Sequence, residues 1–328
     1  MKTQKVSIII PVKEINDYIR ESLWHIDKLD YPKKDIEVII LPDKKNGTIK
    51  KYPYTTKIIQ TGHIFPGAKR DLGLKHSTGK IIAFIDDDVF PAAGWLKKAV
   101  EIFSENGNTA SVCGPAVTPR TDSFLQKVSG YIYASFLGGG GYRYRYMPEE
   151  RRYVDDYPSC NLIIRRDILD KIGGFNTAFW PGEDTVICLK IIKDLKMKIV
   201  YDPEVLVYHH RRNFFFGHIH QVKNYATHRG YFVKRFPETS FRLSYFIPTF
   251  FVIYLLSFLL SFFIKFNLTL SIIWLAPIFI YLILLLIDGI LADNLTYVLP
   301  VMFGILLTHV YYGIYFIKGL LSKKLKEE

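Results

Sequence analysis

The chain has 328 residues, of which 49% are hydrophobic and 15% aromatic, and this length is enough for one large or two modest domains. A net charge of +12 in so apolar a chain favours a membrane surface or a phosphorylated substrate as partner, and no zinc-finger or RNA-binding motif points to nucleic acid. Its three widely spaced cysteines exclude a disulfide framework and a zinc pattern, and they fit a reducing compartment.

The first half of the chain alternates predicted strands and helices. The apolar run from Val6 ends at Pro11, too early for a signal-peptide core, so we expect this part to stay in the cytoplasm. Further apolar runs predict strands at residues 36–41, 57–59, 81–85 and 110–113, and helical spacing predicts helices at 18–29, 67–76 and 95–103. This order is typical of an α/β domain with a Rossmann-like, doubly wound, mostly parallel sheet.

The strand at 81–85 runs directly into Asp86, Asp87 and Asp88. Ligands of open α/β sheets sit at the carboxyl ends of the strands, and adjacent carboxylates repel one another unless a cation lies beside them. Hard oxygen ligands suit Mg²⁺ or Mn²⁺, which substrate phosphates often share. The alternative is a solvated acidic turn.

Residues 130–158 interrupt the alternation. Four glycines, Gly138 to Gly141, precede a run of tyrosines and arginines from Tyr142 to Tyr146. No strand leads in and no Lys-Ser/Thr follows, so the glycines are not a phosphate-binding loop. We expect a mobile loop that could act as an active-site lid, and its tyrosines and arginines either bind a sugar or phosphate or form a solvated hairpin.

A strand at 161–164 and a helix at 166–172 follow, and then Glu183 and Asp184 open another helix. Acids in a first helical turn either compensate the helix dipole or take part in chemistry. Further on, Val205 and Val207 alternate up to His209. The side chain of His209 should therefore share their face, and that of His210 should point away.

The last part of the chain is apolar. Three stretches without Asp, Glu, Lys or Arg, at 246–264, 268–287 and 297–317, are each long enough to cross a bilayer. Basic residues before the first stretch and after the last would both prefer the cytoplasm, which three crossings cannot satisfy. Either one stretch lies in the membrane interface or re-enters the membrane, or the positive-inside rule does not hold for this chain. Residues 214–236 form either a helix at the membrane surface or an ordinary linker.

Several motifs now stand in one order: the strand ending at Pro11, a strand ending in Asp43, Arg70 before a helix, Asp86 to Asp88, and Gly182-Glu183-Asp184. This order resembles the family 2 inverting glycosyltransferases, which have the GT-A fold, and the likeness covers residues 5–235. It implies a cytoplasmic GT-A domain at 1–235, a juxtamembrane linker at 236–245 and an all-α transmembrane domain of about three helices at 246–328.

The resemblance also implies roles for single residues. Asp184 would be the catalytic base, supported by Glu183. Mn²⁺ or Mg²⁺ would be held by Asp86, Asp88 and His209. The nucleotide sugar would contact a larger set, namely Pro11, Val12, Lys13, Asp43, Arg70, Asp86, Asp87, Arg211, Arg212 and Arg229.

The implied activity is a hexosyltransferase-like transfer of one sugar from a UDP- or GDP-linked donor to a hydroxyl of a lipid-linked or cell-envelope glycan. Pro42 stands where many members have Asp, which leaves the nucleotide open, and the Gln-x-x-Arg-Trp of processive synthases is missing after Gln221. A polyprenyl phosphate is already ionised and needs no base, so Glu183 and Asp184 favour a hydroxyl acceptor. The alternatives are a polyprenyl-phosphate glycosyltransferase and a non-catalytic membrane scaffold of the same fold.

Overall fold

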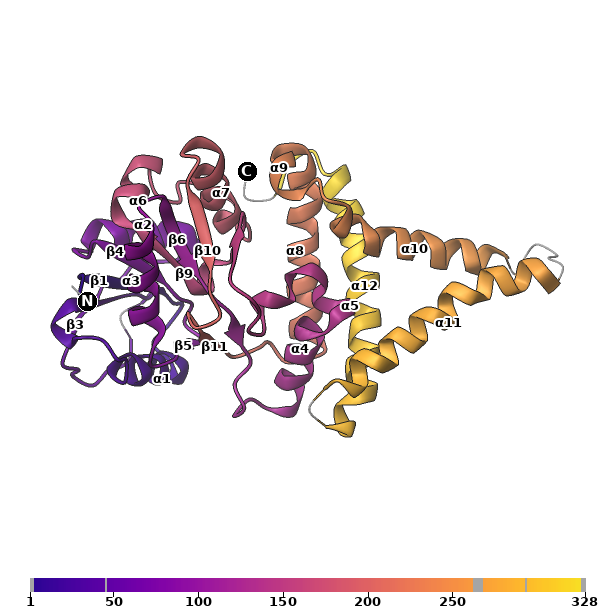
Figure 1. Ribbon diagram of the computed structural model, residues 1–328, viewed down its shortest axis with the longest axis horizontal. Coiled ribbons are helices and arrows are strands. Elements are labelled where there is room, and N and C mark those ends of the chain that lie inside the picture. Colours follow the sequence, from indigo (N-terminus) through magenta and orange to yellow (C-terminus); the bar gives the residue numbers. More distant parts are fainter. Residues whose placement is uncertain (1–2, 45, 262–267, 293, 326–328) are drawn as a thin grey trace. The chain divides into compact units, whose positions relative to one another are not determined.

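A computed structural model describes residues 3–44, 46–261, 268–292 and 294–325, except for the side chains of 261 and 268–271 (Figure 1). The described chain divides into two compact units. The first contains the residues up to Pro119 together with Met147–His210, and the second contains Arg120–Tyr146 together with the residues from Arg211 onwards. The domain boundaries expected at 235 and 246 stay a prediction.

The first unit is built on a mostly parallel sheet, as the sequence predicted. Its strand order is β3-β2-β1-β4-β9-β6-β10-β8. The β1–β2, β1–β4, β2–β3 and β6–β10 pairs are parallel, whereas β9 runs antiparallel to β4 and β6, and β8 runs antiparallel to β10. The strands are β1 (Val6–Pro11), β2 (Ile36–Leu41), β3 (Thr55–Ile58), β4 (Ile81–Phe84), β6 (Thr109–Cys113), β8 (Arg152–Val154), β9 (Leu162–Arg165) and β10 (Lys198–Tyr201).

Helices cover both faces of this sheet because successive strand side chains point to opposite faces. Ile8 and Ile10 of β1 join the core cluster that includes side chains of α1 and α3. Ile9, between them, lies against α2, where a Cβ at Gly73 would collide with it. The helices of the unit are α1 (Asp17–Asp27), α2 (Pro66–His76), α3 (Trp95–Glu105), α6 (Arg166–Ile172) and α7 (Glu183–Leu189).

A second, three-stranded sheet has the order β5-β11-β7 and lies within the same unit. It consists of β5 (Val89–Pro91), β7 (Ala116–Val117) and β11 (Val207–His209). Strand β5 starts directly after Asp88 and pairs antiparallel with β11, so that Val89 is opposite His209. This pairing brings the acidic run and His209 together, although they are distant in sequence.

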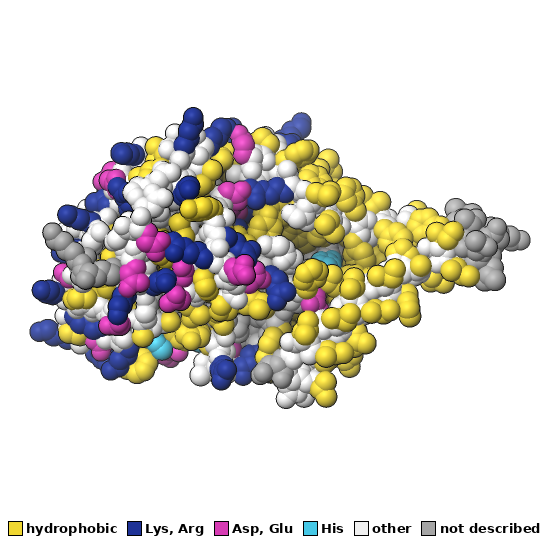
Figure 2. Space-filling view, viewed as in Figure 1, with side chains coloured by type: hydrophobic (Ala, Val, Ile, Leu, Met, Phe, Trp, Pro, Cys, Tyr) yellow, Lys and Arg dark blue, Asp and Glu magenta, His cyan; other side chains and the backbone are white. Residues whose placement is uncertain are grey.

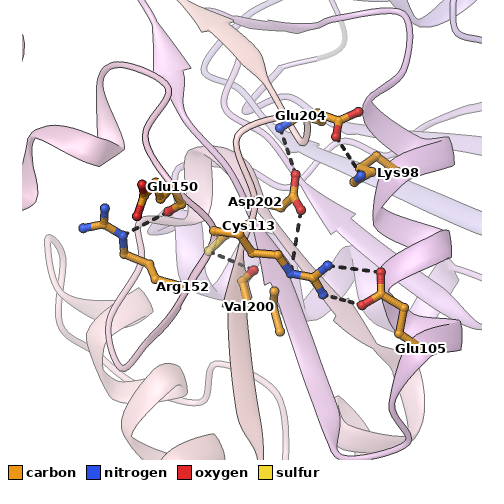
Figure 3. Close-up of polar contacts among 9 residues, drawn as sticks. Lys98, Glu105, Cys113, Glu150, Arg152, Val200, Asp202 and Glu204 are labelled. Carbon is orange, nitrogen blue, oxygen red and sulfur yellow. Dashed lines mark hydrogen bonds and ion pairs between the residues drawn. The ribbon is translucent and has the colours of Figure 1, made fainter.

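Hydrogen bonds and an ion pair connect the edge of the main sheet around β10 to neighbouring parts of the chain (Figure 3). The Asp202 carboxylate accepts a hydrogen bond from the backbone N–H of Glu204 at 3.0 Å, and the Glu204 side chain pairs with Lys98 of α3 at 2.7 Å. On the neighbouring strand β8, the Arg152 Nε donates to the carbonyl of Glu150 at 3.1 Å. These contacts tie the strand ends to α3 and to the chain leading into β8.

The second unit is helical, and hydrophobic side chains cover α10 and α11 almost continuously in Figure 2. Three stretches are long and apolar enough to cross a membrane: Leu243–Leu260, Ile272–Ile290 and Leu295–Leu321. The second stretch was predicted to end at residue 287, but α11 continues through Asp288. The helices are α4 (Phe124–Ala134), α5 (Phe136–Gly139), α8 (Phe216–Arg235), α9 (Pro237–Ser240), α10 (Leu243–Ser261), α11 (Leu268–Ile290) and α12 (Val298–Leu321).

The expectation of a loop at 130–158 is wrong for most of its length. Residues from Phe124 to Gly139 form α4 and α5, and a 3₁₀ helix follows at Gly140–Arg145. Ser123 opens α4 with a capping box, in which its hydroxyl and the Gln126 side chain each bind the other's backbone N–H. The sequence pattern did not predict these helices, because glycine is disfavoured inside helices and four glycines occur here.

Candidate active site

The carboxyl ends of β1, β2 and β4 lie next to one another, because these three strands are parallel neighbours. Val12 and Lys13 follow β1, Asp43 follows β2, and Asp86 follows β4. The backbone links the first two of these turns, since the N–H of Asp43 donates to the carbonyl of Lys13 at 3.1 Å. The sheet therefore gathers residues from across the first hundred positions at one edge.

Arg70 joins two of the predicted acidic residues. It lies in α2 and is 2% exposed. Its Nη2 donates to Asp86 Oδ1 at 2.7 Å, and its Nη1 donates to Glu183 Oε1 at 2.8 Å. Burial alone would lower the pKa of Arg70, but Asp86 and Glu183 outweigh it and hold that pKa above its ordinary value. The guanidinium thus links the end of β4 to the start of α7.

Glu183 is the buried member of the acidic pair. It is 5% exposed and lies in the first turn of α7, directly after Gly182, whose φ of +117° favours glycine. Burial, and then the neighbouring Asp184 carboxylate, raise the pKa of Glu183 to about 7, against the opposing effect of Arg70. The protonated form of this carboxyl is therefore more favoured than that of an exposed glutamate.

Asp184 is partly exposed, unlike Glu183. Its Oδ1 accepts from the backbone N–H of Thr185 at 2.8 Å, and its Oδ2 accepts from the backbone N–H of Ser159 at 3.3 Å. Both carboxylate oxygens are therefore oriented by the backbone. Of the two acids, Asp184 is the one that a substrate can reach.

Asp88 and His209 form a second acidic-basic contact at this edge. His209 Nε2 lies 3.2 Å from Asp88 Oδ1, and both side chains are about 15% exposed. His210 points elsewhere, and its Nε2 lies 2.9 Å from Glu21 Oε2 of α1. The two histidines thus face different partners, in line with the alternation that the sequence predicted.

The donor atoms of Asp88 and His209 suit a divalent cation. Two ligands at about 2.1 Å from one ion, on adjacent octahedral positions, are about 3 Å apart, close to the spacing of these atoms. Across the described residues, no three His, Cys, Asp or Glu side chains form a group that could hold a metal ion. Asp86, predicted as a further ligand, pairs with Arg70 through Oδ1, and its contact with a metal stays a prediction. An ion here would need phosphate or water oxygens as its other ligands.

Lys69 is a residue whose role sequence reasoning missed. It is 4% exposed, and its ammonium group contacts both the Asp43 carboxylate and the carbonyl of Val12. His63 Nδ1 lies 3.1 Å from the other Asp43 oxygen. Burial would raise the pKa of Asp43, but the hydrogen bonds from Lys69 and His63 lower it below its ordinary value. The available signal was a lysine directly before Arg70, in the same helical turn.

Sequence reasoning also missed two hydrogen bonds that connect Asp71 of α2 to the chain before α7, and we call this connection the Asp71 brace. Both oxygens of the Asp71 carboxylate accept backbone hydrogen bonds, from Phe175 at 2.8 Å and from Asn176 at 2.9 Å. Gly174 has a φ of +69°, and a Cβ there would collide with Asp71. The Phe175 ring in turn lies 5.4 Å from the Arg70 guanidinium. This brace fixes the loop on which Glu183 and Asp184 depend.

The three predicted arginines at 211, 212 and 229 belong to the second unit. Arg229 lies in α8, donates from Nε to the Tyr225 hydroxyl at 3.0 Å, and stacks on the rings of Tyr225 and Tyr245. The backbone N–H of Arg211 donates to Asp122 at 3.2 Å. Their contact with a nucleotide sugar stays a prediction, as does that of Asp87.

Residues 7–173 match the model of a family described as glycosyl transferase family 2. Glycosyltransferase AglE of Haloferax volcanii is 25% identical over 64% of this chain and 68% of its own length. A Methanococcus voltae protein is 24% identical over 97% of both chains, and its name is dolichyl N-acetyl-alpha-D-glucosaminyl phosphate 3-beta-D-2,3-diacetamido-2,3-dideoxy-beta-D-glucuronosyltransferase.

Among solved structures, the chain is similar to the mannosyltransferase PcManGT from Pyrobaculum calidifontis in complex with GDP-Man and Mn²⁺. The TM-score is 0.64 at 15% identity, and the match covers 98% of this chain and 89% of that one. At this identity the likeness concerns the fold, which is the GT-A-like sheet followed by helices.

Proposed function

The chain belongs to glycosyl transferase family 2, and from this premise we propose that it is an inverting, metal-dependent enzyme that moves one sugar from a nucleotide sugar to a hydroxyl group. The acceptor is a lipid-linked or cell-envelope glycan. One observation carries this proposal: Asp184, partly exposed and oriented through both oxygens, stands beside the buried Glu183–Arg70–Asp86 network.

Asp184 is the proposed catalytic base. An acceptor hydroxyl is a weak nucleophile until a base takes its proton. In one step the acceptor oxygen bonds to the anomeric carbon, Asp184 receives the proton, and the bond from that carbon to the diphosphate oxygen breaks. The diphosphate leaves with the bonding electrons, and attack from the opposite face inverts the anomeric centre. Glu183 is too buried for this role and positions Arg70 instead.

Asp88 and His209 are the proposed protein ligands of Mn²⁺ or Mg²⁺, with Asp86 next to them. When bound, the cation neutralises negative charge on the leaving diphosphate. The turns at Lys13 and Asp43, with Lys69 and His63, are proposed to hold the base and ribose of the nucleotide. GDP-linked mannose, which the Pyrobaculum protein binds, is the first donor to test, followed by UDP-linked sugars.

The acceptor is proposed to be borne by the membrane. Three helices are apolar enough to enter a bilayer, and the Methanococcus relative is named for a dolichyl-phosphate-linked sugar. Such a sugar offers a hydroxyl, which needs the base that Asp184 supplies. We propose that the catalytic unit lies on the cytoplasmic side, where nucleotide sugars are made.

The test compares two acceptors and two variants of the purified full-length protein. Asp184→Asn should lower transfer to a polyprenyl-phosphate-linked sugar by at least about 10²-fold, as expected for loss of a general base. Asp194→Asn, an exposed acid close along the same segment, is the control and should keep full activity. Near-full transfer by Asp184→Asn to a bare polyprenyl phosphate would overturn the proposed acceptor and favour the polyprenyl-phosphate glycosyltransferase.

A further inference from the structure

The helix α12 has a polar neighbour along most of its length. It runs parallel to α8 in the second unit (Figure 1). Near the start of the contact, His218 of α8 meets the Thr308 hydroxyl at 2.9 Å. At its end, Lys234 Nζ donates to the carbonyl of Ser322, directly after α12, at 2.7 Å. Contact thus extends over almost the whole of α8.

The backbones of these two helices touch at glycines. A Cβ at Gly230 of α8 would collide with the carbonyl of Phe316, and a Cβ at Gly319 of α12 would collide with the carbonyl of Thr227. Such contact leaves no room for lipid between the helices. Whatever depth α12 takes in a membrane, α8 must therefore take a similar depth.

The sequence of α8 is incompatible with the hydrocarbon core. Of its four cations, Arg229 is buried and Lys223 is half-buried. The helix exposes the polar side chains of His220, Gln221, Asn224, Lys234 and Arg235. Ionisable and polar side chains at the bilayer centre are costly unless they face the protein interior or water. A crossing by α12 would carry these exposed side chains through the bilayer with it.

Among the described residues, α12 contacts only about half of each of the other two apolar helices. In α10 they come from the first half, where Phe246 stacks on Phe316 and the Thr249 hydroxyl donates to the carbonyl of Gly313. In α11 they come from the second half, where Tyr281 contacts His309 and Leu285 shares a core cluster with Val301 and Ile305. Beyond these contacts, large apolar side chains are more than half exposed, namely Leu256, Leu259 and Leu260 of α10 and Ile272 and Phe279 of α11.

Asp288 and His309 show the same arrangement. Asp288, near the end of α11, accepts the backbone N–H groups of Phe136 and Leu137 at 2.8 and 2.7 Å. His309, in the middle of α12, has its Nε2 3.0 Å from the carbonyl of the same Leu137. Since a carbonyl only accepts, Nε2 carries the proton, and Nδ1 accepts from the Tyr281 hydroxyl at 2.8 Å. The segment at Phe136 and Leu137 thus contacts both the end of α11 and the middle of α12.

We propose that only α10 and α11 cross the bilayer, as a hairpin, while α12 lies in the membrane interface beside α8. Its outward apolar side chains, among them Leu299, Phe303, Ile314 and Leu321, then face the lipid headgroup and acyl boundary of one leaflet. Figure 1 shows α10 and α11 extending together away from the α8–α12 pair. Two crossings also place the basic residues before α10 and after α12 on one side, as the positive-inside rule requires.

Cysteine accessibility in intact cells tests this topology. The three native cysteines are buried, so they give little background labelling. With a membrane-impermeant maleimide, Lys323→Cys, after α12, should react only once the cells are permeabilised, like Lys51→Cys in the catalytic unit. Lys265→Cys, between α10 and α11 and outside the described residues, should react in intact cells. Reaction of Lys323→Cys in intact cells would overturn the proposal, because it requires three crossings.

Depth measurements distinguish a failure of this inference from a failure of the proposed membrane anchor. Fluorophores on single cysteines at Leu299, Ile314 and Leu321 should be quenched equally, and best by headgroup-proximal spin labels in the vesicles. A fluorophore at Phe279 of α11 should be quenched best by labels deep in the acyl chains. If Ile314 proves as deep as Phe279, α12 crosses and the inference fails. If Phe279 is not quenched at all, the membrane anchor is wrong, and the inference falls with it.

Discussion

Arg70 is the residue on which the geometry of the site depends. It is almost fully buried, and its two terminal nitrogens hold carboxylates from the end of β4 and the start of α7. The planar guanidinium can bridge two acids in this way, whereas a lysine ammonium acts as a single point charge. Without it, the buried Glu183 carboxylate would lose the cation with which it pairs. The proposed base Asp184 follows Glu183 directly in the chain, so the Arg70–Glu183 ion pair fixes the start of the helix that carries it.

We predict that Arg70→Met destabilises the protein by about 3–5 kcal/mol, the usual effect of removing one partner from a buried ion pair. Arg20→Met, at an exposed ion pair of α1, is the control and should change stability by less than about 1 kcal/mol. Thermal or denaturant unfolding measures both. Equal effects of the two substitutions would mean that the Arg70 bridge carries no more weight than a surface pair.

Glu183 gives a pH dependence of known sign. Burial raises its pKa from an ordinary 4.5 to about 7. Between these values the folded protein holds a proton that the unfolded chain has lost, so stability present below about pH 4.5 declines as the pH rises through about 7.

The matching prediction is that Glu183→Gln flattens the fall in melting temperature between pH 5 and pH 8. The glutamine keeps a hydrogen-bond acceptor for Arg70 and has no proton to lose. Unfolding followed by circular dichroism at both pH values measures the difference between the variant and the native protein. An unchanged slope in the variant would assign the pH dependence to other groups.

At the scale of elements, the loop before α7 determines where Glu183 and Asp184 lie. The Asp71 carboxylate of α2 holds the backbone N–H groups of Phe175 and Asn176, and Gly174 supplies the left-handed conformation that the turn needs. The loop is therefore fixed from α2, the same helix that carries Lys69 and Arg70. One short helix thus contacts both the proposed nucleotide side and the proposed base side of the site.

Gly174→Ala should destabilise the protein by about 1–3 kcal/mol and lower transfer, because the new Cβ strains the backbone and displaces the Asp71 carboxylate. Gly94→Ala is a matched control: Gly94 has a helical backbone and open space around its Cα, so the change should be neutral. Melting temperatures and initial rates of the two variants, side by side, measure the difference. Equal behaviour would contradict the role of the brace.

The same elements show what could be predicted from the sequence. Continuous apolar runs identified β1, β2 and β4, and with them the edge where Asp43 and Asp86 lie, because a buried strand has a purely local signature. The Asp88–His209 contact depends on β5 pairing with β11, and the Asp71 brace depends on a side chain reaching a distant loop. Such contacts between remote segments leave no local pattern. The helices at 124–139 were missed because their glycines and aromatic residues are poor helix formers, and packing within the second unit offsets this.

At the scale of the whole molecule, the part of the sequence that matches the family is divided between the two units. The segment Arg120–Tyr146 lies within the part that matches glycosyl transferase family 2, yet it belongs to the helical unit. Within that unit Asp288 and His309 bind its backbone, and the Phe124 ring stacks on Tyr297 at 4.9 Å. The family domain therefore contributes an element to the unit that carries the three apolar helices. A boundary drawn from composition alone could not find this.

The most direct test of the account is turnover of a nucleotide sugar by the purified full-length protein. With Mn²⁺ or Mg²⁺, we predict hydrolysis or transfer from GDP-mannose or from one of a panel of UDP-linked sugars. The activity should be lost on chelation and reduced at least about 10²-fold in Asp184→Asn. Failure of every donor to bind or turn over, in a protein that is folded and loaded with metal, would contradict the account.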